Sequence, residues 1–543
     1  MTLSDKVYNT LKELVAAPGV SGTESENLTS EKIYSILSEI PYFKNNKKNF
    51  GMELIEEDPY GRSFVWGVVH GKEQSNNTLI LTGHLDVVEV EEFGHLKPVA
   101  FNIEECTKRI GELNLDKEAL RDLESGKWIF GRGTADMKYG IALDIEMLRE
   151  LSEDRNFKGN LLFLAVPGEE SNSEGMIASV PFLLKLQEER GYDYCGVIVS
   201  ECCIPDNEND KLKKLYMGTV GKIMPLFFCV GKETHVGESL KGLNPNALVS
   251  EINRLLEYNP DFSDQVNDTI TPPPTCLKQL DLKELYSVQT PLYAAAYYNI
   301  LTLSISEDKL MGDLKELSLK AFNNVLDLLK EKRDKFIKKS SDKVQYMEVE
   351  PCVMTYEELL MEVKAKVKDF DKYIKDKVEL WKKEKMDNQT IAINIVKETY
   401  EKYNSKKPMI IVSFIPPYYP HKYLQGIDDK SKRLIDVIDE TIELAEKKFN
   451  EKLIKEDFFM AISDLSYTGI EGSKNLDHLS SNIVGYDINY KLPLDCLNKL
   501  NIPGIVFGGE GKDFHKYTER LNVPYSFNVV PELYKNMIFS LLK

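Results

Sequence analysis

The sequence predicts an α/β protein in which a mixed, largely parallel sheet is flanked by helices and a smaller α+β domain is inserted. Two observations lead to this prediction. Short β-branched runs alternate with helical patterns through residue 213. From about residue 214 the pattern changes to one of longer strands and helices. A late apolar strand and a further strand-helix stretch then complete the first domain.

The length of 543 residues exceeds what one hydrophobic core usually organises, so at least two domains are expected. We predict a first domain in two parts, residues 1–213 and 407–543. A lid domain is expected at 214–355. Residues 356–406 form a helical insertion rich in lysine and glutamate, which we interpret as a solvated surface.

The strands of the first part are predicted at SFVWGVVHG, NTLILTGHLDVV, NLLFLAVPGEE and CGVIVSE, with a helix around IALDIEMLREL. Residues 102–126 interrupt this rhythm and are interpreted as a surface insertion. The lid is predicted from a long strand at 214–231, helices starting near Asn246 and Glu307, and a strand through AAAYYNILTLSIS. The strand MIIVSFIPPYYP at 409–420 is expected to return the chain to the first domain.

Composition excludes several classes of function. With 42% hydrophobic and 29% charged residues the chain is typical of a soluble globular protein. The net charge of -18 would repel a phosphate backbone, so nucleic acid is not expected as a partner. No apolar run approaches about 18 residues, so no membrane association is expected. The N-terminus resembles an amphipathic helix, and eight dispersed cysteines indicate reduced thiols, so we expect a cytoplasmic protein.

Candidate metal ligands follow the predicted strands. His84 and Asp86 come directly after TLILT, and the two-residue period of a strand places them on the same side. Asp136 stands in a glycine-bounded loop before a helix. Glu169 and Glu170 follow the buried strand LLFLAV. Each has a plainer explanation, namely a structural histidine, a helix cap and a solvent-facing acidic turn.

Two further groups complete the pattern: Glu201 after the strand GVIVS, and His515 after GIVF. Imidazole and carboxylate ligands with open coordination positions suit a divalent metal that activates water and polarises a carbonyl. Of two adjacent carboxylates, one can bind metal while its neighbour moves a proton. The set therefore predicts a metal site of two histidines and at least three carboxylates.

In this order, His-x-Asp, Gly-Arg-Gly-x-x-Asp-Met-Lys at 131–138, Glu-Glu, Glu and a late His resemble the M20 family of metallopeptidases and aminoacylases. Ser21-Gly22-Thr23-Glu24 matches the family's opening. The insertions and the ending His515-Lys516-Tyr517-Thr518-Glu519-Arg520 are most similar to its arginine-utilisation branch. The resemblance implies a zinc-peptidase-like catalytic domain and a ferredoxin-like lid.

The same resemblance implies two zinc ions, with cobalt or manganese as alternatives. Asp136 would bridge them, His84 and Glu201 would complete one site, and Glu170 and His515 the other. Glu169 would be the general base and acid, and Asp86 would fix the tautomer of His84. A glutamate at 201 favours acylase or carboxypeptidase-like substrates.

In the lid, His235 resembles the family's oxyanion-stabilising histidine, often supplied by a neighbouring subunit, so a homodimer through the lid is expected. Asn246, at the helix entry, and Asp464 resemble substrate contacts. Taken alone, His235 reads as a surface histidine and Asp464 as a turn or helix cap. The strand 298–302 lacks the arginine that many relatives use to grip a substrate carboxylate. His70, His95, His421 and His478 match no metal position.

The sequence thus predicts a di-zinc hydrolase that cleaves an amide bond in a small N-acyl amino acid or peptide-like molecule, with a role in arginine or amino-acid catabolism. Two alternatives stay open. One is a dipeptidase or aminopeptidase with the same metal chemistry, and the other is a catalytically silent homologue that binds a ligand. Retention of Glu169 and Asp86, which a binding protein does not require, favours an enzyme.

Overall fold

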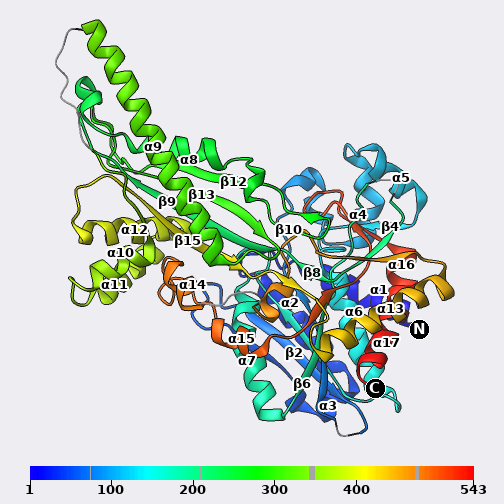
Figure 1. Ribbon diagram of the computed structural model, residues 1–543. Coiled ribbons are helices and arrows are strands. Elements are labelled where there is room, and N and C mark those ends of the chain that lie inside the picture. Colours follow the sequence, from blue (N-terminus) through cyan, green and yellow to red (C-terminus); the bar gives the residue numbers. More distant parts are fainter. Residues whose placement is uncertain (74, 208–209, 341–348, 471–475) are drawn as a thin grey trace. The chain divides into compact units, whose positions relative to one another are not determined.

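The computed structural model describes residues 1–73, 75–207, 210–340, 349–470 and 476–543 (Figure 1). The chain divides into two compact units. Unit 1 comprises residues 1–220, 422–470 and 493–543, and unit 2 comprises residues 221–421 and 471–492. The predicted α/β class with an inserted α+β domain is confirmed.

Unit 1 is built on an eight-stranded mixed sheet in the order β1-β2-β5-β3-β6-β18-β7-β17. Its strands are β1 (Phe50–Leu54), β2 (Ser63–His70), β3 (Asn77–His84), β5 (Asn160–Val166), β6 (Asp193–Val199), β7 (Lys213–Tyr216), β17 (Leu453–Glu456) and β18 (Gly504–Val506). The four central strands β5, β3, β6 and β18 run parallel to one another. Their carboxyl ends therefore meet at one edge of the sheet.

Helices cover this sheet, because packing their apolar faces against it removes the apolar side chains of both from water. They are α1 (Leu3–Val15), α2 (Glu26–Glu39), α3 (Pro41–Asn45), α6 (Lys138–Glu153), α7 (Glu174–Arg190), α13 (Asp429–Leu444), α15 (Leu494–Leu500), α16 (Val523–Asn528) and α17 (Val530–Leu541). Helix α6 is buried along most of its length and packs against α1 and β3. Its first turn directly follows Asp136, so a rigid core element fixes that residue.

The predicted surface insertion forms two short helices, α4 (Ile103–Arg109) and α5 (Lys117–Ser125), which have their own small apolar cluster with β4 (Trp128–Phe130). Strand β4 joins a three-stranded sheet with β19 (Gly511–Lys512) and β20 (Arg520–Asn522). A two-stranded sheet of β8 (Gly218–Thr219) and β16 (Lys422–Tyr423) completes the strands of unit 1 that the structure describes.

Unit 2 contains a five-stranded sheet in the order β12-β13-β9-β15-β14, antiparallel except for the β14-β15 pair. Its strands are β9 (Gly221–Val230), β12 (Thr275–Asp281), β13 (Tyr293–Thr302), β14 (Val353–Thr355) and β15 (Met409–Tyr419), beside the short pair β10 (Gln265–Val266) and β11 (Thr269–Ile270). Strand β15 was expected in the first domain, but the structure places it here instead. All eleven of its residues are buried, and such a run does not indicate which sheet it joins.

Helices lie on both faces of this second sheet (Figure 1). They are α8 (Pro245–Leu256), α9 (Glu307–Ser340), α10 (Tyr356–Lys364), α11 (Phe370–Lys383), α12 (Asn388–Tyr403) and α14 (Leu476–Asn482). Leu226 and Phe228 of β9 share a core with α10, α11 and α12. On the other face, the Tyr298 hydroxyl donates to Asn253 of α8.

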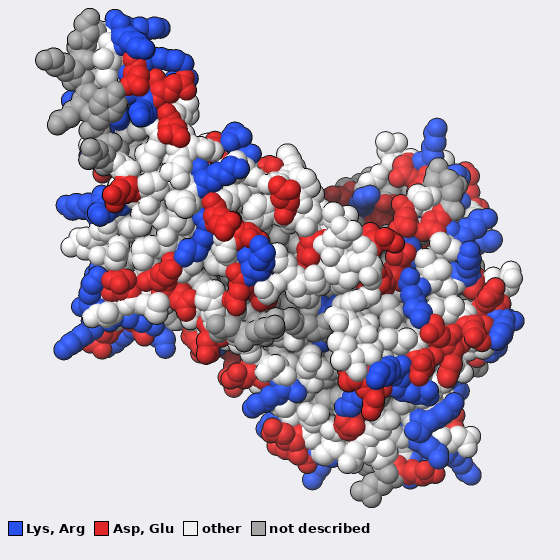
Figure 2. Space-filling view, viewed as in Figure 1, with Lys and Arg blue, Asp and Glu red and all other residues white. Residues whose placement is uncertain are grey.

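Charge is distributed over the surface. On the face seen in Figure 2, acidic and basic side chains are interspersed, so the net charge of -18 does not form one acidic face there. Among the described residues, no helix has both the length and the apolar character that crossing a membrane requires.

Candidate metal centre

The predicted ligands of unit 1 converge at the carboxyl edge of its parallel strands. His84 is the last residue of β3, Glu169 and Glu170 follow β5, and Glu201 follows β6. His515 comes after β18 and β19. Adjacent parallel strands end at the same edge, which explains why residues so far apart in sequence meet.

The first ligand set consists of His84, Asp136 and Glu201, all buried. The Nε2 atom of His84 lies 3.0 Å from Oδ1 of Asp136 and 3.2 Å from Oε1 of Glu201. One ligand atom from each residue lies within 4.8 Å of the others. The three side chains therefore face one point in space.

The second set consists of Asp136, Glu170 and His515. The Nε2 atom of His515 lies 3.1 Å from Oδ2 of Asp136 and 3.0 Å from Oε2 of Glu170. Asp136 therefore directs one carboxylate oxygen to each imidazole, and it is the residue that the two sets share.

The donor chemistry fits a pair of divalent ions. Zinc takes imidazole nitrogen and carboxylate oxygen at about 2.0–2.2 Å, which puts tetrahedral ligand atoms roughly 3.4 Å apart. The nitrogen-to-oxygen separations of 3.0–3.2 Å in both sets are close to that spacing. Each set offers three ligands and leaves a position for water or substrate, as catalytic zinc sites do.

The charges of the two sets depend on one another. Burial opposes the charge on Asp136, but hydrogen bonds from His515 and His84 hold its pKa below the usual value. The hydrogen bond with Asp136 and that with Glu170 raise the pKa of His515 to about 10. Burial, reinforced by Asp136, raises the pKa of Glu170 to about 7. Protons and metal ions thus compete for the same atoms.

Glu169 belongs to neither ligand set, although it adjoins both. Its Oε2 lies 4.0 Å from Nε2 of His84, and only 9% of its side chain is exposed. Burial raises its pKa well above the usual value, and Glu170 adds to this. A carboxyl with a raised pKa beside a metal site can take up and return a proton more readily than an exposed one.

Asp86 lies beneath the turn that carries the two glutamates. Its Oδ1 accepts the N–H of Glu169 and its Oδ2 accepts the N–H of Glu170, each at 3.1 Å. The Nδ1 atom of His84 lies 3.0 Å from the main-chain oxygen of Asp86 and 3.6 Å from its carboxylate. One residue therefore orients both the imidazole and the acidic turn.

Two supporting residues were not singled out from the sequence. Glu519 accepts the N–H groups of Ala135 and Asp136, and pairs with Arg132 at 2.7 Å. Arg132 also donates to the main-chain oxygen of His515. Both lie in motifs quoted for the resemblance, but only the fold joins them, because 387 residues separate them.

Gly140 allows α6 to approach the end of β6 closely. A Cβ atom there would lie 2.2 Å from the main-chain oxygen of Ser200, the residue before Glu201. Any side chain would push α6 away from β6. The preceding residue, Tyr139, is buried, and its hydroxyl donates to the main-chain oxygen of Ser526.

The two lid residues of the prediction lie in unit 2. His235 is exposed at the start of η4 (Val236–Lys241), and its Nδ1 accepts the N–H of Gly237 at 3.1 Å. Asn246 is in the first turn of α8 and donates to Asp281 at 3.3 Å. Asp464, in unit 1, is buried in η7 (Asp464–Thr468), which packs against β3 and β6, and the charges of His84 and Glu201 act on the pKa of its carboxyl.

The four histidines excluded from the prediction have other surroundings. His70 contacts the hydroxyls of Tyr42 and Tyr192, and His95 pairs with Glu112. His421 contacts Thr302, and His478 pairs with Asp308 and Glu357. In the part of the chain that the structure describes, none belongs to a three-ligand cluster.

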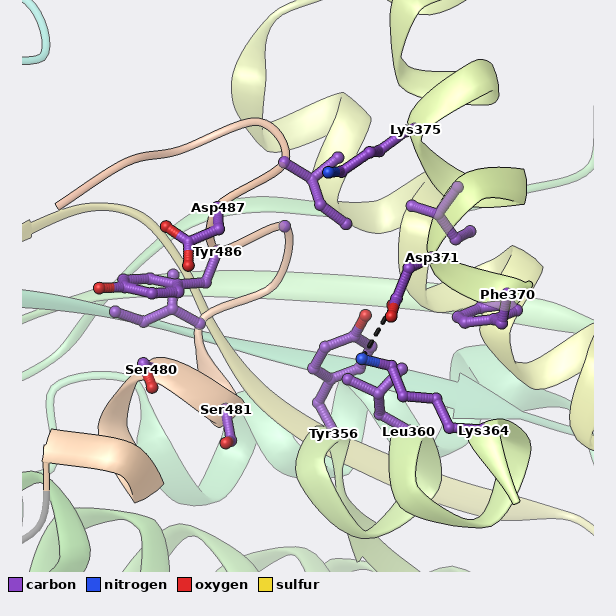
Figure 3. Close-up of a pocket in the computed structure, with 14 residues that line it drawn as sticks. Tyr356, Leu360, Lys364, Phe370, Asp371, Lys375, Ser480, Ser481, Tyr486 and Asp487 are labelled. Atoms are coloured by element: carbon purple, nitrogen blue, oxygen red, sulfur yellow. Dashed lines mark ion pairs between the residues drawn. The ribbon is translucent and has the colours of Figure 1, made fainter. Parts of the chain in front are cut away.

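A separate cavity of about 340 Å³ lies in unit 2, between α10, α11 and residues 480–488 (Figure 3). Lys364 and Asp371 pair at 2.8 Å on one wall, and Tyr486 and Asp487 lie on the opposite wall. None of the residues predicted for the site lines it. The insertion predicted at 356–406 as a solvated surface therefore lines part of a cavity within unit 2.

Comparisons with known proteins point to one family. The sequence profile described as peptidase family M20/M25/M40 matches residues 80–476. The chain is 34% identical to protein YqjN of Bacillus subtilis (strain 168), over 99% of this chain and 97% of that protein. It is 30% identical to protein RocB of the same organism, over 100% and 96% of the two chains.

Among solved structures, the chain is similar to the Bacillus subtilis YXEP protein, which is described as a dinuclear metal-binding peptidase from the M20 family. The TM-score is 0.50 at 11% identity, and the match covers 99% of this chain and 98% of that one. At this identity the likeness concerns the fold. It extends over both units of the chain.

Proposed function

The chain belongs to peptidase family M20/M25/M40, whose members are metal-dependent hydrolases of amide bonds, and from this membership we propose that it is a di-zinc amidohydrolase. Its substrate is a small N-acyl amino acid or peptide-like molecule. The observation that carries the proposal is the position of Asp136, with one carboxylate oxygen toward each of two histidines.

We assign one zinc ion to His84, Asp136 and Glu201, and the other to Asp136, Glu170 and His515. Cobalt or manganese would fit the same ligands, since affinity order alone does not decide metal identity. Two bound ions supply Lewis acidity that polarises the scissile carbonyl and makes a water molecule a better nucleophile.

Glu169 carries the proton. It is close to both ligand sets without belonging to either, and its raised pKa lets it accept a proton from the attacking water. The same carboxyl then protonates the departing amine nitrogen. Asp86 fixes the turn that holds Glu169 and orients the imidazole of His84 through its main-chain oxygen.

His235 is assigned the stabilisation of the oxyanion that forms on the carbonyl. The ring accepts the N–H of Gly237 at Nδ1, so the Nε2–H of the same tautomer can donate to the oxyanion. An exposed position suits a residue that acts after closure of the lid or from a second subunit, so a homodimer through unit 2 belongs to the proposal. Asn246 and Asp464 are proposed as substrate contacts.

The cellular setting is part of the proposal. All eight cysteines are free, which is typical of proteins from reducing compartments, so we place the enzyme in the cytoplasm. We propose a role in arginine or amino-acid catabolism, because the insertions and the segment from His515 to Arg520 resemble the arginine-utilisation branch of the family.

The test is a hydrolysis panel of N-acyl amino acids and dipeptides, with zinc, cobalt and manganese measured on the same sample. Release of free amine from the N-acyl compounds with about two metal ions per chain supports the proposal. Preference for dipeptides would make the chain a dipeptidase or aminopeptidase of the same chemistry. Ligand binding without any hydrolysis would make it a silent homologue.

A further inference from the structure

Asp464 is a buried carboxylate without a hydrogen-bond partner. It is 1% exposed, and among the described residues neither of its oxygens contacts a donor. Burying a polar group without a partner is costly, and buried side-chain polar atoms usually have one. A hydrogen-bond donor on a bound ligand would stabilise such a buried carboxylate.

A role as a helix cap does not explain this residue. The cap of η7 (Asp464–Thr468) is Ser463, whose hydroxyl accepts the N–H of Leu465 at 3.3 Å. The carboxylate of Asp464 accepts no such bond. Its side chain is therefore available for a contact outside its own turn.

The carboxylate lies beside the metal centre. Helix η7 packs against β3 and β6, the strands whose ends carry His84 and Glu201. The pKa of Asp464 is raised to about 7, mainly by burial and also by the charges of Asp86 and Glu201, although His84 acts to lower it. Asp464 in turn raises the pKa of Glu169. Its charge thus reaches the carboxyl that we propose to handle the proton.

The charge balance of the centre leaves Asp464 without a counter-ion. Five other carboxyl groups belong to the two ligand sets or adjoin them, and once ionised they outnumber the four positive charges of two divalent ions: Asp86, Asp136, Glu169, Glu170 and Glu201. The buried cations nearby are engaged elsewhere. Lys138 donates to three main-chain oxygens, and Arg132 pairs with Glu519. No lysine or arginine in the described chain is among the charges acting on Asp464.

Resting on the proposed amidohydrolase function, we propose that Asp464 binds a cationic nitrogen of the substrate and so selects positively charged amides. An ammonium or guanidinium group would satisfy both carboxylate oxygens and neutralise the excess charge. Two kinds of substrate supply this chemistry. One is a dipeptide with a free α-ammonium, and the other is an N-acyl amino acid with a basic side chain.

The test compares matched substrates in the wild type and in D464N, a nearly isosteric change. N-acetyl-L-lysine is paired with N-acetyl-L-norleucine, and L-alanyl-L-alanine with its N-acetylated form. For each pair we compare kcat/KM of the cationic member, divided by kcat/KM of the neutral member. In one pair this ratio should fall roughly 10- to 100-fold in D464N, as expected for loss of a charge-assisted hydrogen bond. The pair whose ratio falls identifies the source of the cation. Asp429→Asn, at an exposed carboxylate of α13, is the matched control.

Calorimetry on zinc-loaded Glu169→Gln and on the double variant with D464N measures the same preference without turnover. The inference is supported if Glu169→Gln binds the cationic member more tightly and the double variant loses this preference. This result would hold even if the wild type hydrolyses no amide, and then only the proposed function would fail. Equal binding of both members in the Glu169→Gln protein overturns the inference. Loss of zinc in D464N overturns it too, because Asp464 would then be a metal ligand.

Discussion

Arg132 and Glu519 form a fully buried ion pair of 2.7 Å, although 387 residues separate them in the sequence. Glu519 also accepts the N–H of Asp136, and Arg132 donates to the main-chain oxygen of His515. The pair therefore joins the residue shared by both ligand sets to the late histidine. It is one of the contacts that bring distant segments of unit 1 together at the site.

Arg132→Met should destabilise the protein by about 3–5 kcal/mol, because it leaves the charge of Glu519 buried without its partner. Chemical unfolding measures this change. The exposed pair of Arg109 and Glu112 provides the control, and Arg109→Met should change stability little. Equal effects of the two substitutions would show that the buried pair does not support the fold.

Asp86→Asn should lower kcat about 10- to 100-fold and weaken metal binding, because the amide keeps one accepting oxygen and its NH2 group cannot accept the second of the N–H groups of Glu169 and Glu170. Steady-state kinetics and zinc titration check the two effects. Unchanged kcat in this variant would mean that the turn keeps its position without the aspartate.

Glu169 and Glu170 are neighbours on one turn, but their substitution by glutamine should affect turnover and metal content differently. Glu169→Gln should lower kcat about 100- to 10,000-fold while keeping both ions, because it removes the proton carrier and no ligand. Glu170→Gln should lose the ion held with His515. Metal analysis and turnover on both proteins decide the assignment, and loss of metal from Glu169→Gln would contradict it.

The metal-free protein should become less stable as the pH rises from about 7 to about 10. His515 has a folded pKa of about 10, above its ordinary value, so its stabilising charge is present at low pH and is lost as the pH rises through that range. Glu170, raised to about 7, acts in the same direction below that pH. Thermal unfolding after chelation measures the fall, which His515→Gln should reduce. A Tm that rises with pH would contradict this account.

Much of the site could be predicted because its ligands follow apolar strands whose pattern is clear in the sequence. His84, Glu170 and Glu201 each come within a few residues of the end of β3, β5 or β6. Parallel neighbours bring such residues together. The Arg132-Glu519 pair could not be predicted, because no local pattern connects residues so distant. Strand β15 was assigned to the first domain because a fully apolar run fits any buried sheet.

The roles that depend on other partners are less visible in the sequence. Asp464 falls in a short polar stretch where a helix cap is the ordinary explanation, and only the structure shows that Ser463 provides the cap. Likewise, the glutamates at 169 and 170 look equivalent in sequence. Only the structure shows that Glu170 belongs to a ligand set and Glu169 lies beside it, and our proposal of Glu169 as the proton carrier rests on this difference.

The most direct test of the central claim is anomalous diffraction at the zinc edge from crystals grown with zinc. Two peaks are predicted, one among His84, Asp136 and Glu201 and one among Asp136, Glu170 and His515, so that Asp136 lies between them. A single peak, or peaks away from Asp136, would contradict the account.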